Sequence, residues 1–459
     1  MTSLRKLPIR LMLLSFFSFI CTNINSQDGK YLYDYADDFS EGLAVVMKNG
    51  KCGVIDKTGK SVVPFDYDFI WGYHSNRARV IKYWDEKKNK LNQKELDNSS
   101  LYSYYKYSNY QNTEDSCYYG FIDHLGKVII PLEYDYASDF HDGYSIVSKN
   151  GKYGLIDIEG NIVIPIIYDR IFDTLFYVGM DNNLIGAETD GKIGFINILT
   201  GKNAIPFEFD HMQEVPFFSE GLAAVKNNKK YIFIDTIGNI KIPTEWDYAS
   251  NFNKGFALVR NDACYYLIND KGDITRKIGN ADDITVTSNQ QIIVVKKRNK
   301  NWEIYDGNDQ TISELDYSYV SHWINDLFIV STSGNTENKR RFGCIDKKGN
   351  VIVPIKYNDF YPYSDGYIIA RKNKRWYCLQ VKGNKISAQA AIPRFCQVVD
   401  YFHEGMARIV KRGKYGFINT NGKIVIPTKY ENARSFYEGM VAVQKNGKWG
   451  FVDIKGNEL

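Results

Sequence analysis

The 459-residue sequence lacks several features that would assign it to a familiar class of protein. No apolar run reaches the length of about 18 residues that a membrane-spanning helix requires. Its 58 Lys and Arg residues nearly balance 54 Asp and Glu residues, so the bulk basic charge typical of a nucleic-acid-binding protein is missing. The seven cysteines contain no close pair such as Cys-x-x-Cys, which argues against a disulfide scaffold. In contrast, 35 Tyr and 36 Gly residues against 11 Pro residues are typical of strands and turns.

Residues 1–26 have the pattern of a secretory signal peptide. Arg5, Lys6 and Arg10 supply a positive start, and Leu11–Cys21 is an apolar stretch too short to span a membrane. Cleavage after Ser26 removes three positive charges, which leaves +4 − 3 = +1 on the rest of the chain. We therefore expect an exported protein, located in the periplasm, on the cell surface or outside the cell, with no transmembrane segment once the signal is removed.

Residues 27–459 repeat one unit many times. Lys414–Tyr430 reads KYGFINTNGKIVIPTKY, and Lys152–Tyr168 reads KYGLIDIEGNIVIPIIY. Eleven copies of the unit are marked by the residue that precedes the glycine position: Cys52, Tyr119, Tyr153, Ile193, Tyr231, Tyr265, Trp302, Phe342, Trp376, Tyr415 and Trp449. Successive copies lie 34 to 40 residues apart except at the first gap, which an insertion lengthens. Such a period indicates stacked units that bury a core against one another.

This pattern resembles the WG-repeat family, named for the pair seen here at Trp449-Gly450. The unit continues with Phe-Ile-[Asp/Asn], Gly, Val-Ile-Pro and then Tyr-[Asp/Glu]-x-Ala-x-x-Phe, as in Tyr430–Phe436. An [Asp/Glu]-Gly-hydrophobic-Ala-x-Val element, as in Glu41–Val46, precedes it. The resemblance covers Tyr31–Leu459 and weakens between Cys264 and Ile312. The family has no established catalytic residues, so the resemblance implies a fold and no activity.

Each unit is predicted to be a β-meander, which makes the fold class all-β. Asn446-Gly447 is a strong hairpin signal, and the glycine within the following strand predicts a close approach of a neighbouring backbone. Proline in Val-Ile-Pro predicts a strand end or an unpaired sheet edge. Because propellers typically have about 4–8 blades, eleven units favour an open, superhelical or solenoid-like tandem array. Residues 29–32 are expected to add only a stub of strand at the chain end. The alternative is a β-propeller, as one large ring or two.

No catalytic, cofactor-binding or metal-binding residue is predicted. The six histidines form neither His-x-His nor His-Glu-x-x-His, and no phosphate-binding or nucleophile motif occurs in a strand–helix context. Side chains that recur in every unit are expected to cap turns, because catalysis needs one asymmetric constellation. These recurrent side chains are Asp56, Asp123, Asp157, Asn197, Asp235, Asp346, Asn419 and Asp453.

The insertion at Lys82–Ser116 is the main departure from the repeat. Clustered aromatic side chains supply rigid amphipathic contact surface, as binding loops often do. The insertion is therefore a candidate contact loop, with a merely flexible loop or an extended hairpin as the alternative. Its candidate contact residues are Trp84, Tyr102, Tyr104, Tyr105, Tyr107 and Tyr110.

The sequence thus predicts an exported, non-enzymatic binding or scaffold protein that presents an extended β-repeat surface. Its partner is expected to be a protein or a cell-envelope glycan, and no nucleic acid or cofactor is expected. Alternatives are a glycan-binding repeat protein and a hydrolase with a site in the repeat groove. Cys344 and Cys378 share one repeat position in adjacent units, so a disulfide between them stays open for an array in which equivalent strands stack closely.

Overall fold

The computed structural model describes residues 30–83, 117–173, 183–213, 215–253, 255–286, 292–297, 302–306, 311–315, 317–324, 327–332, 340–364, 366–382 and 385–459. These residues form 42 β-strands and contain no α-helix. The described residues therefore include no candidate for a membrane-spanning helix. The predicted signal peptide, residues 1–26, lies outside the described residues.

The strands form eleven repeat units, numbered 1 to 11 here in chain order. Nine sheets hold one unit each, and a seven-stranded sheet holds two units that share the single residue pair Asp210–Lys226, which gives 9 + 2 = 11. A complete unit is a four-stranded antiparallel meander, whereas the fifth and the last units have three strands each. The predicted all-β tandem array of about eleven repeats is therefore confirmed.

Every unit except the fifth has a first strand, and most first strands are only two residues long. The first strands are β1 (Tyr35–Ser40), β5 (Phe69–Ile70), β9 (Tyr136–Ala137), β13 (Arg170–Ile171), β20 (Tyr248–Ala249), β24 (Ala281–Val286), β28 (Tyr319–Ile324), β32 (Asp359–Ser364), β36 (Gln397–Val398) and β40 (Asn432–Ala433). The second strands are β2 (Leu43–Lys48), β6 (Ala78–Tyr83), β10 (Tyr144–Lys149), β14 (Leu184–Thr189), β17 (Leu222–Asn227), β21 (Phe256–Asn261), β25 (Ile292–Lys297), β29 (Leu327–Ser331), β33 (Tyr367–Lys372), β37 (Met406–Lys411) and β41 (Met440–Lys445).

The third strands carry the aromatic-Gly pair, and the fourth strands carry the Val-Ile-Pro element. The third strands are β3 (Lys51–Asp56), β7 (Cys117–Ile122), β11 (Lys152–Asp157), β15 (Lys192–Asn197), β18 (Lys230–Asp235), β22 (Cys264–Asn269), β26 (Trp302–Asp306), β30 (Phe342–Asp346), β34 (Arg375–Lys382), β38 (Lys414–Asn419) and β42 (Lys448–Asp453). The fourth strands are β4 (Ser61–Tyr67), β8 (Val128–Tyr134), β12 (Ile162–Tyr168), β16 (Lys202–Asp210), β19 (Ile240–Trp246), β23 (Ile274–Gly279), β27 (Thr311–Leu315), β31 (Val351–Tyr357), β35 (Lys385–Ala391) and β39 (Ile424–Tyr430).

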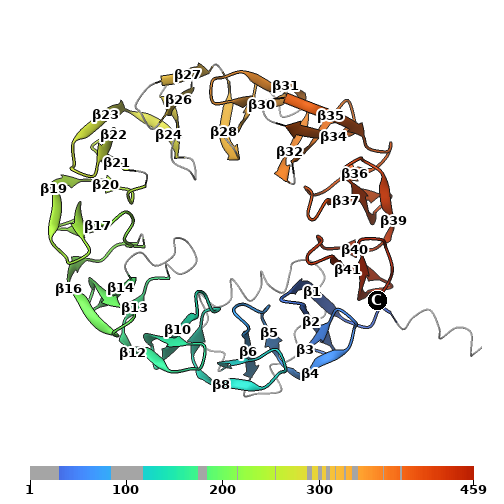
Figure 1. Ribbon diagram of the computed structural model, residues 1–459, viewed down its shortest axis with the longest axis horizontal. Helices are drawn as coiled ribbons and strands as arrows, with labels where there is room; N and C mark the ends of the chain where they lie inside the picture. Colours follow the sequence, from blue (N-terminus) through green and yellow to red (C-terminus); the bar gives the residue numbers. More distant parts are fainter. Residues whose placement is uncertain are drawn as a thin grey trace, which may run out of the picture.

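The units follow one another around a single closed ring (Figure 1). First strands face the centre, fourth strands form the periphery, and β1 of unit 1 lies beside β41 of unit 11. The structure therefore has the second of the two predicted arrangements, one large propeller-like ring, and the preference for an open array is corrected. The preference rested on the usual number of about 4–8 blades in a propeller, which this ring of eleven units exceeds.

Both ends of the chain complete unit 11 and close the ring. The amides of Leu32 and Tyr33 donate to the carbonyl of Trp449 at 3.1 and 3.2 Å, and the Trp449 amide donates to Tyr33 at 2.7 Å. From the other end, the Leu459 amide donates to the carbonyl of Phe451 at 2.9 Å. The missing fourth strand of unit 11 is thus shared between the two ends. The expectation that residues 29–32 add only a stub overlooked the contribution of the C-terminal end.

Aromatic pairs hold adjacent units together in the core. A Phe on a third strand meets a Phe that precedes the second strand of the next unit, with ring centroids 4.6 to 5.0 Å apart and inclined to each other. The pairs are Phe121–Phe140, Phe195–Phe218, Phe233–Phe252, Phe417–Phe436 and Phe451–Phe39. The last pair joins unit 11 to unit 1 as the others join neighbours in sequence.

The two predictions about glycine and proline are confirmed. A Cβ atom added at Gly416 would lie 2.6 Å from the carbonyl oxygen of Ile426 on the adjacent fourth strand, so only glycine allows the strands to approach there. Pro427 is exposed on that same outermost strand, where its missing amide costs no hydrogen bond. Pro393 differs, since it follows β35 instead of lying within a strand.

Candidate interaction face

The meander gives the ring two faces with different chemistry. We define the hairpin face by the turns between second and third strands and by the connections from each fourth strand to the next unit. We define the opposite face by the turns between first and second strands and between third and fourth strands. Strand direction alternates within each antiparallel unit, so these turns fall on the same side in all units.

A ladder of ion pairs runs around the hairpin face. The lysine that begins a third strand bonds an acidic side chain at the start of the next unit: Lys51 bonds Asp68 at 2.5 Å, and Lys152 bonds Asp169 at 2.5 Å. Lys192–Asp210, Lys230–Asp247, Lys414–Glu431 and Lys448–Asp34 repeat the contact, the last of them across the ring closure. These recurrent charges therefore have a role in joining units.

The carboxylates of this ladder also accept hydrogen bonds from backbone amides of the hairpin turns. The second oxygen of Asp169 accepts the backbone amide of Asp190 at the tip of the adjacent hairpin, 2.8 Å away. The hydrogen bond from Lys152 lowers the pKa of Asp169, and the same bond raises the pKa of Lys152. Hydrogen bonds from Lys192 and Lys230 likewise lower the pKa values of Asp210 and Asp247. The carboxylates of Asp169, Asp210 and Asp247 are thus held in their charged form.

The insertion predicted as a contact loop leaves from this face. Tyr83 at the end of β6 pairs with Cys117 at the start of β7, so residues 84–116 replace the short hairpin turn found in other units. The candidate contact residues Trp84, Tyr102, Tyr104, Tyr105, Tyr107 and Tyr110 lie outside the described residues. The structure places the base of the insertion, at Tyr83 and Cys117.

On the opposite face, the recurrent Asp and Asn side chains cap turns as predicted. Oδ1 of Asp157 accepts the amides of Glu159 at 3.0 Å and of Asn161 at 2.8 Å. The same two bonds recur in other units, for example at Asp123 and Asp453. These carboxylates stabilise the turn between third and fourth strands.

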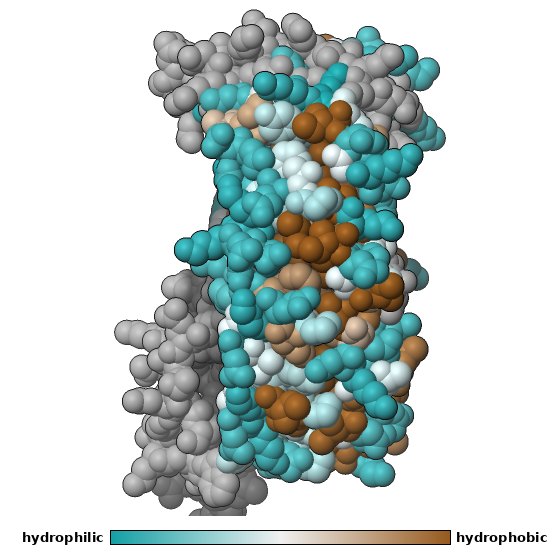
Figure 2. Space-filling model, turned by 90° about the vertical axis from the view of Figure 1, so that its left-hand side faces the viewer, coloured by the Kyte–Doolittle hydropathy of each residue, from teal (hydrophilic) through white to brown (hydrophobic). Residues whose placement is uncertain are grey.

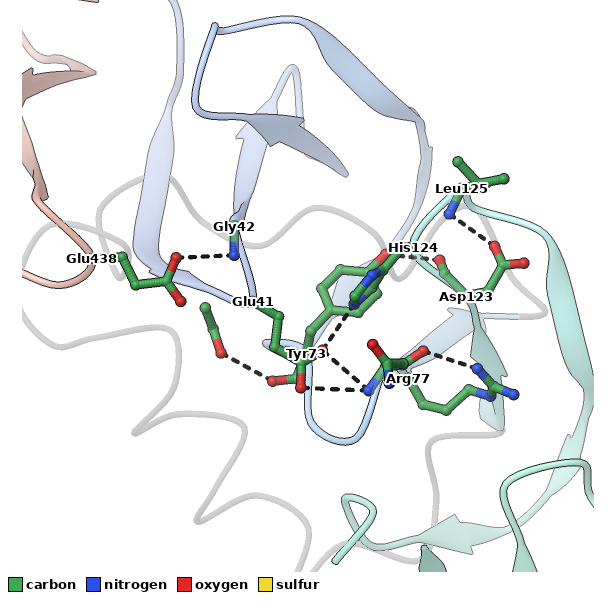
Figure 3. Close-up of polar contacts among 10 residues, drawn as sticks. Glu41, Gly42, Tyr73, Arg77, Asp123, His124, Leu125 and Glu438 are labelled. Atoms are coloured by element: carbon green, nitrogen blue, oxygen red, sulfur yellow. Dashed lines mark hydrogen bonds and ion pairs between the residues drawn. The ribbon is translucent and has the colours of Figure 1, made fainter.

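A second ladder, made of hydrogen bonds from backbone amides to glutamate side chains, runs along the opposite face. The sequence analysis did not predict it. Glu404 accepts the backbone amides of Glu438 and Gly439, at 2.7 and 2.8 Å, from the equivalent turn of the next unit. Glu438 in turn accepts the amide of Gly42 at 2.9 Å across the ring closure, and Glu41 accepts the amide of Asn76 at 3.1 Å (Figure 3). The repeated [Asp/Glu]-Gly element was visible in the sequence, but its bonding partner lies a whole unit away.

Histidines occupy the same turns without forming a metal site. His124 Nε2 lies 2.8 Å from Glu41, and its ring packs edge-on against Tyr73, whose hydroxyl donates to the carbonyl of Asp123 (Figure 3). His141 and His403 both lie in turns between first and second strands. Within the described ranges, no three His, Cys, Asp or Glu side chains are grouped closely enough to hold a metal ion.

Cys344 and Cys378 are free and buried, with no bond between them. Burial raises the pKa of each thiol to about 12, so neither is a ready nucleophile. Equivalent positions of adjacent units are separated by the interface between units, which explains why the bridge left open by the sequence does not form.

The outer edge of the ring carries separate apolar patches. Figure 2 views the edge formed by β16, β19 and β23, where brown apolar patches alternate with hydrophilic side chains. Exposed apolar residues there include Leu199, Ile237, Ile240 and Ile274. Exposed Pro206 on β16 and Pro243 on β19 limit pairing of these two strands with another sheet edge.

Comparisons with known proteins support the fold. The family described as "WG containing repeat" matches residues 28–52, 53–83, 119–153, 153–192, 193–231, 233–263, 342–376 and 415–449. None of the curated proteins compared with the chain matches it.

Solved structures that resemble the chain do so at low identity and low TM-score. A eukaryotic initiation factor shares 14% identity over 67% of this chain and 92% of its own, with a TM-score of 0.39. BamB from Moraxella catarrhalis shares 10% identity over 69% and 95%, with a TM-score of 0.29. Hsv2 from Kluyveromyces lactis shares 11% identity over 55% and 96%, with a TM-score of 0.30.

The eight matched segments cover more than half of the sequence and coincide with units whose aromatic-Gly, Val-Ile-Pro and [Asp/Glu]-Gly elements have the structural roles described above. The chain therefore belongs to the WG containing repeat family.

Proposed function

We propose that this chain is an exported, non-enzymatic binding or scaffold protein whose hairpin face contacts a protein or another component of the cell envelope. The observation that carries the proposal is the origin of the 84–116 segment. It replaces a hairpin turn at Tyr83–Cys117 and so leaves the ring from the hairpin face, as the one long departure from an otherwise regular repeat.

The recurrent charged residues support a binding role over a catalytic one. These charged side chains form the two ladders that join units. Examples are the ion pair of Lys152 with Asp169 and the hydrogen bond from the amide of Gly439 to Glu404. Side chains engaged in this way serve the scaffold, which leaves non-recurrent segments as the natural place for contacts with a partner.

The test is crosslinking of the intact exported protein in its native envelope, followed by identification of the crosslinked partner by mass spectrometry. A matched variant replaces residues 84–116 with Asn-Gly, the turn found at Asn49-Gly50, and keeps the β6–β7 hairpin. We expect the partner to be captured by the wild-type protein and lost with the variant.

A second variant changes Tyr102, Tyr104, Tyr105, Tyr107 and Tyr110 to Ser and keeps the length of the segment. Loss of the partner in both variants supports aromatic contacts. Equal capture by wild type and both variants would exclude the insertion as the contact. A protein that stays in the cytoplasm would contradict export.

A further inference from the structure

The hairpin face is not uniform in charge. Hairpin tips of units 4 and 6 carry Asp190 and Asp262, whereas those of units 9 and 10 carry Lys374 and Arg412. The tips of units 11 and 1 are the uncharged Asn446-Gly447 and Asn49-Gly50, each flanked by lysines, and these units follow units 9 and 10 around the ring (Figure 1). We call the hairpin face of units 9, 10, 11 and 1 the basic arc.

Acidic side chains on the basic arc are already paired. Asp359 bonds Arg371, Glu431 bonds Lys414, and Asp34 bonds Lys448. Five further cations have no carboxylate partner within the described part of the chain: Lys48, Lys374, Arg394, Lys411 and Arg412. Positive charge therefore remains uncompensated on units 9 and 10, with one further cation, Lys48, on unit 1.

An exposed aromatic side chain lies within the basic arc. Phe395 is 87% exposed, at the turn from β35 to β36, and it directly follows Arg394. Its φ of 67° lies in the left-handed region, which is uncommon for a bulky residue. Packing within the ring does not explain this strain, because a side chain so exposed buries little surface. Strain of this kind is characteristic of functional positions.

The shape of the basic arc favours one class of partner. Its cations lie in the hairpin turns and the connections of neighbouring units, which fall on one face of the ring. Lys and Arg distributed over a plane, with an aromatic ring projecting among them, suit the headgroup region of an anionic bilayer. Lipid phosphates pair with the cations, and the aromatic ring enters the apolar boundary below them.

We propose that the basic arc docks the ring on an anionic lipid surface. This inference deepens the proposed function by naming one envelope component, and it rests on the premise that the hairpin face is the binding face. It assigns the lipid contact to Phe395 and its neighbouring cations, whereas the protein contact is assigned to the insertion.

The test is co-sedimentation of the full-length protein, without its signal peptide, with lipid vesicles. Vesicles of phosphatidylcholine are compared with vesicles that contain about 30% phosphatidylglycerol, a composition that makes the surface strongly anionic. We expect binding to the anionic vesicles only, with a loss of about tenfold or more when salt is raised from about 0.05 M to about 0.5 M. Absence of binding to anionic vesicles at low salt would overturn the proposal.

Two variants and a matched control locate the surface. The triple variant K374Q/R394Q/R412Q should weaken binding by about tenfold or more, since each cation near the surface contributes to attraction. The control K127Q/K202Q/K241Q removes the same charge from the opposite face, where these exposed lysines begin or adjoin fourth strands, and should bind like wild type. Equal loss in both triple variants would refute a localised surface.

The Phe395→Ser variant distinguishes binding to a lipid bilayer from binding to a soluble polyanion. We expect a loss of about threefold or more on vesicles with an unchanged salt dependence, because an apolar contact is removed. If heparin or DNA binds as tightly as the vesicles and Phe395→Ser changes neither, the basic arc binds polyanions and the membrane assignment is wrong. The variant that lacks residues 84–116 should still bind vesicles. A failure of the lipid proposal, seen as loss of vesicle binding, can therefore be distinguished from a failure of the proposed function, seen as loss of partner capture.

Discussion

The ammonium of Lys448 bonds the carboxylate of Asp34 across 414 positions of sequence. Lys51 makes the same contact with Asp68 across only 17 positions, because these residues belong to adjacent units. The contact between the two chain ends is thus the ordinary contact between neighbours. Unit 11 and unit 1 are packed like any other adjacent pair, so stability of the ring depends on both ends of the described chain.

Tyr31 is expected to be important for ring closure. It is buried on unit 11, with its ring 6.5 Å from that of Tyr430. Tyr31→Ala should lower the free energy of unfolding by about 3 kcal/mol, the usual cost of removing a buried aromatic side chain. Urea denaturation checks this against Tyr319→Ala, a change at an exposed residue. Similar stability of the two variants would show that the N-terminal segment does not pack on unit 11.

Gly416 is expected to tolerate no side chain. An added Cβ would lie 2.6 Å from the carbonyl oxygen of Ile426 and 2.7 Å from the amide nitrogen of Thr428, both in the backbone of the adjacent strand. Gly416→Ala should therefore destabilise the protein by about 2 kcal/mol or more. Gly72→Ala is the matched control, because nothing lies within 4 Å of its added Cβ. Thermal unfolding in which Gly416→Ala matches Gly72→Ala would argue against the close approach of third and fourth strands.

Asp38 should make stability depend on pH. Burial raises the pKa of Asp38 to about 6, although Arg434, 3.9 Å away, partly opposes this shift. Because the folded-state pKa is above the ordinary value of 3.8, folding favours the protonated carboxyl. Its contribution to stability is full below about pH 4 and is lost as pH rises through about 6.

Asp38→Asn keeps the side chain neutral at every pH. It should stabilise the protein by about 1–2 kcal/mol near pH 8 and have little effect near pH 4. Chemical denaturation at both pH values measures the difference. An equal effect at both values would show that the carboxyl is not desolvated in the ring.

The glutamate ladder on the opposite face should protect backbone amides of the next unit. Glu404→Ala removes the acceptor of two amides and should cost about 1 kcal/mol. Hydrogen exchange should accelerate at Glu438 and Gly439 and stay unchanged with Glu159→Ala, a control at an exposed turn. Unchanged exchange at Glu438 and Gly439 would contradict the inter-unit bond.

Much of the unit could be predicted because its signals are local. Asn446-Gly447 predicted a hairpin, Gly450 predicted a close backbone approach, and Asp157 predicted a capped turn, since each depends on residues a few positions away. Ring closure could not be predicted in this way, because it needs Lys30–Tyr33 and the C-terminal end to occupy one strand position together. Glu404 and Glu438 were missed for the same reason, since each bonds an amide more than 30 residues away.

Zero-length carbodiimide crosslinking of the unmodified protein tests the closed ring most directly. The reagent joins an amine to a carboxylate only when the two are in contact, and Lys152–Asp169 serves as the internal positive control. The closed ring predicts that mass spectrometry of the monomer will also find Lys448 joined to Asp34 and Lys57 joined to Glu438. Recovery of Lys152–Asp169 without either end-to-end product in the monomer would contradict the ring.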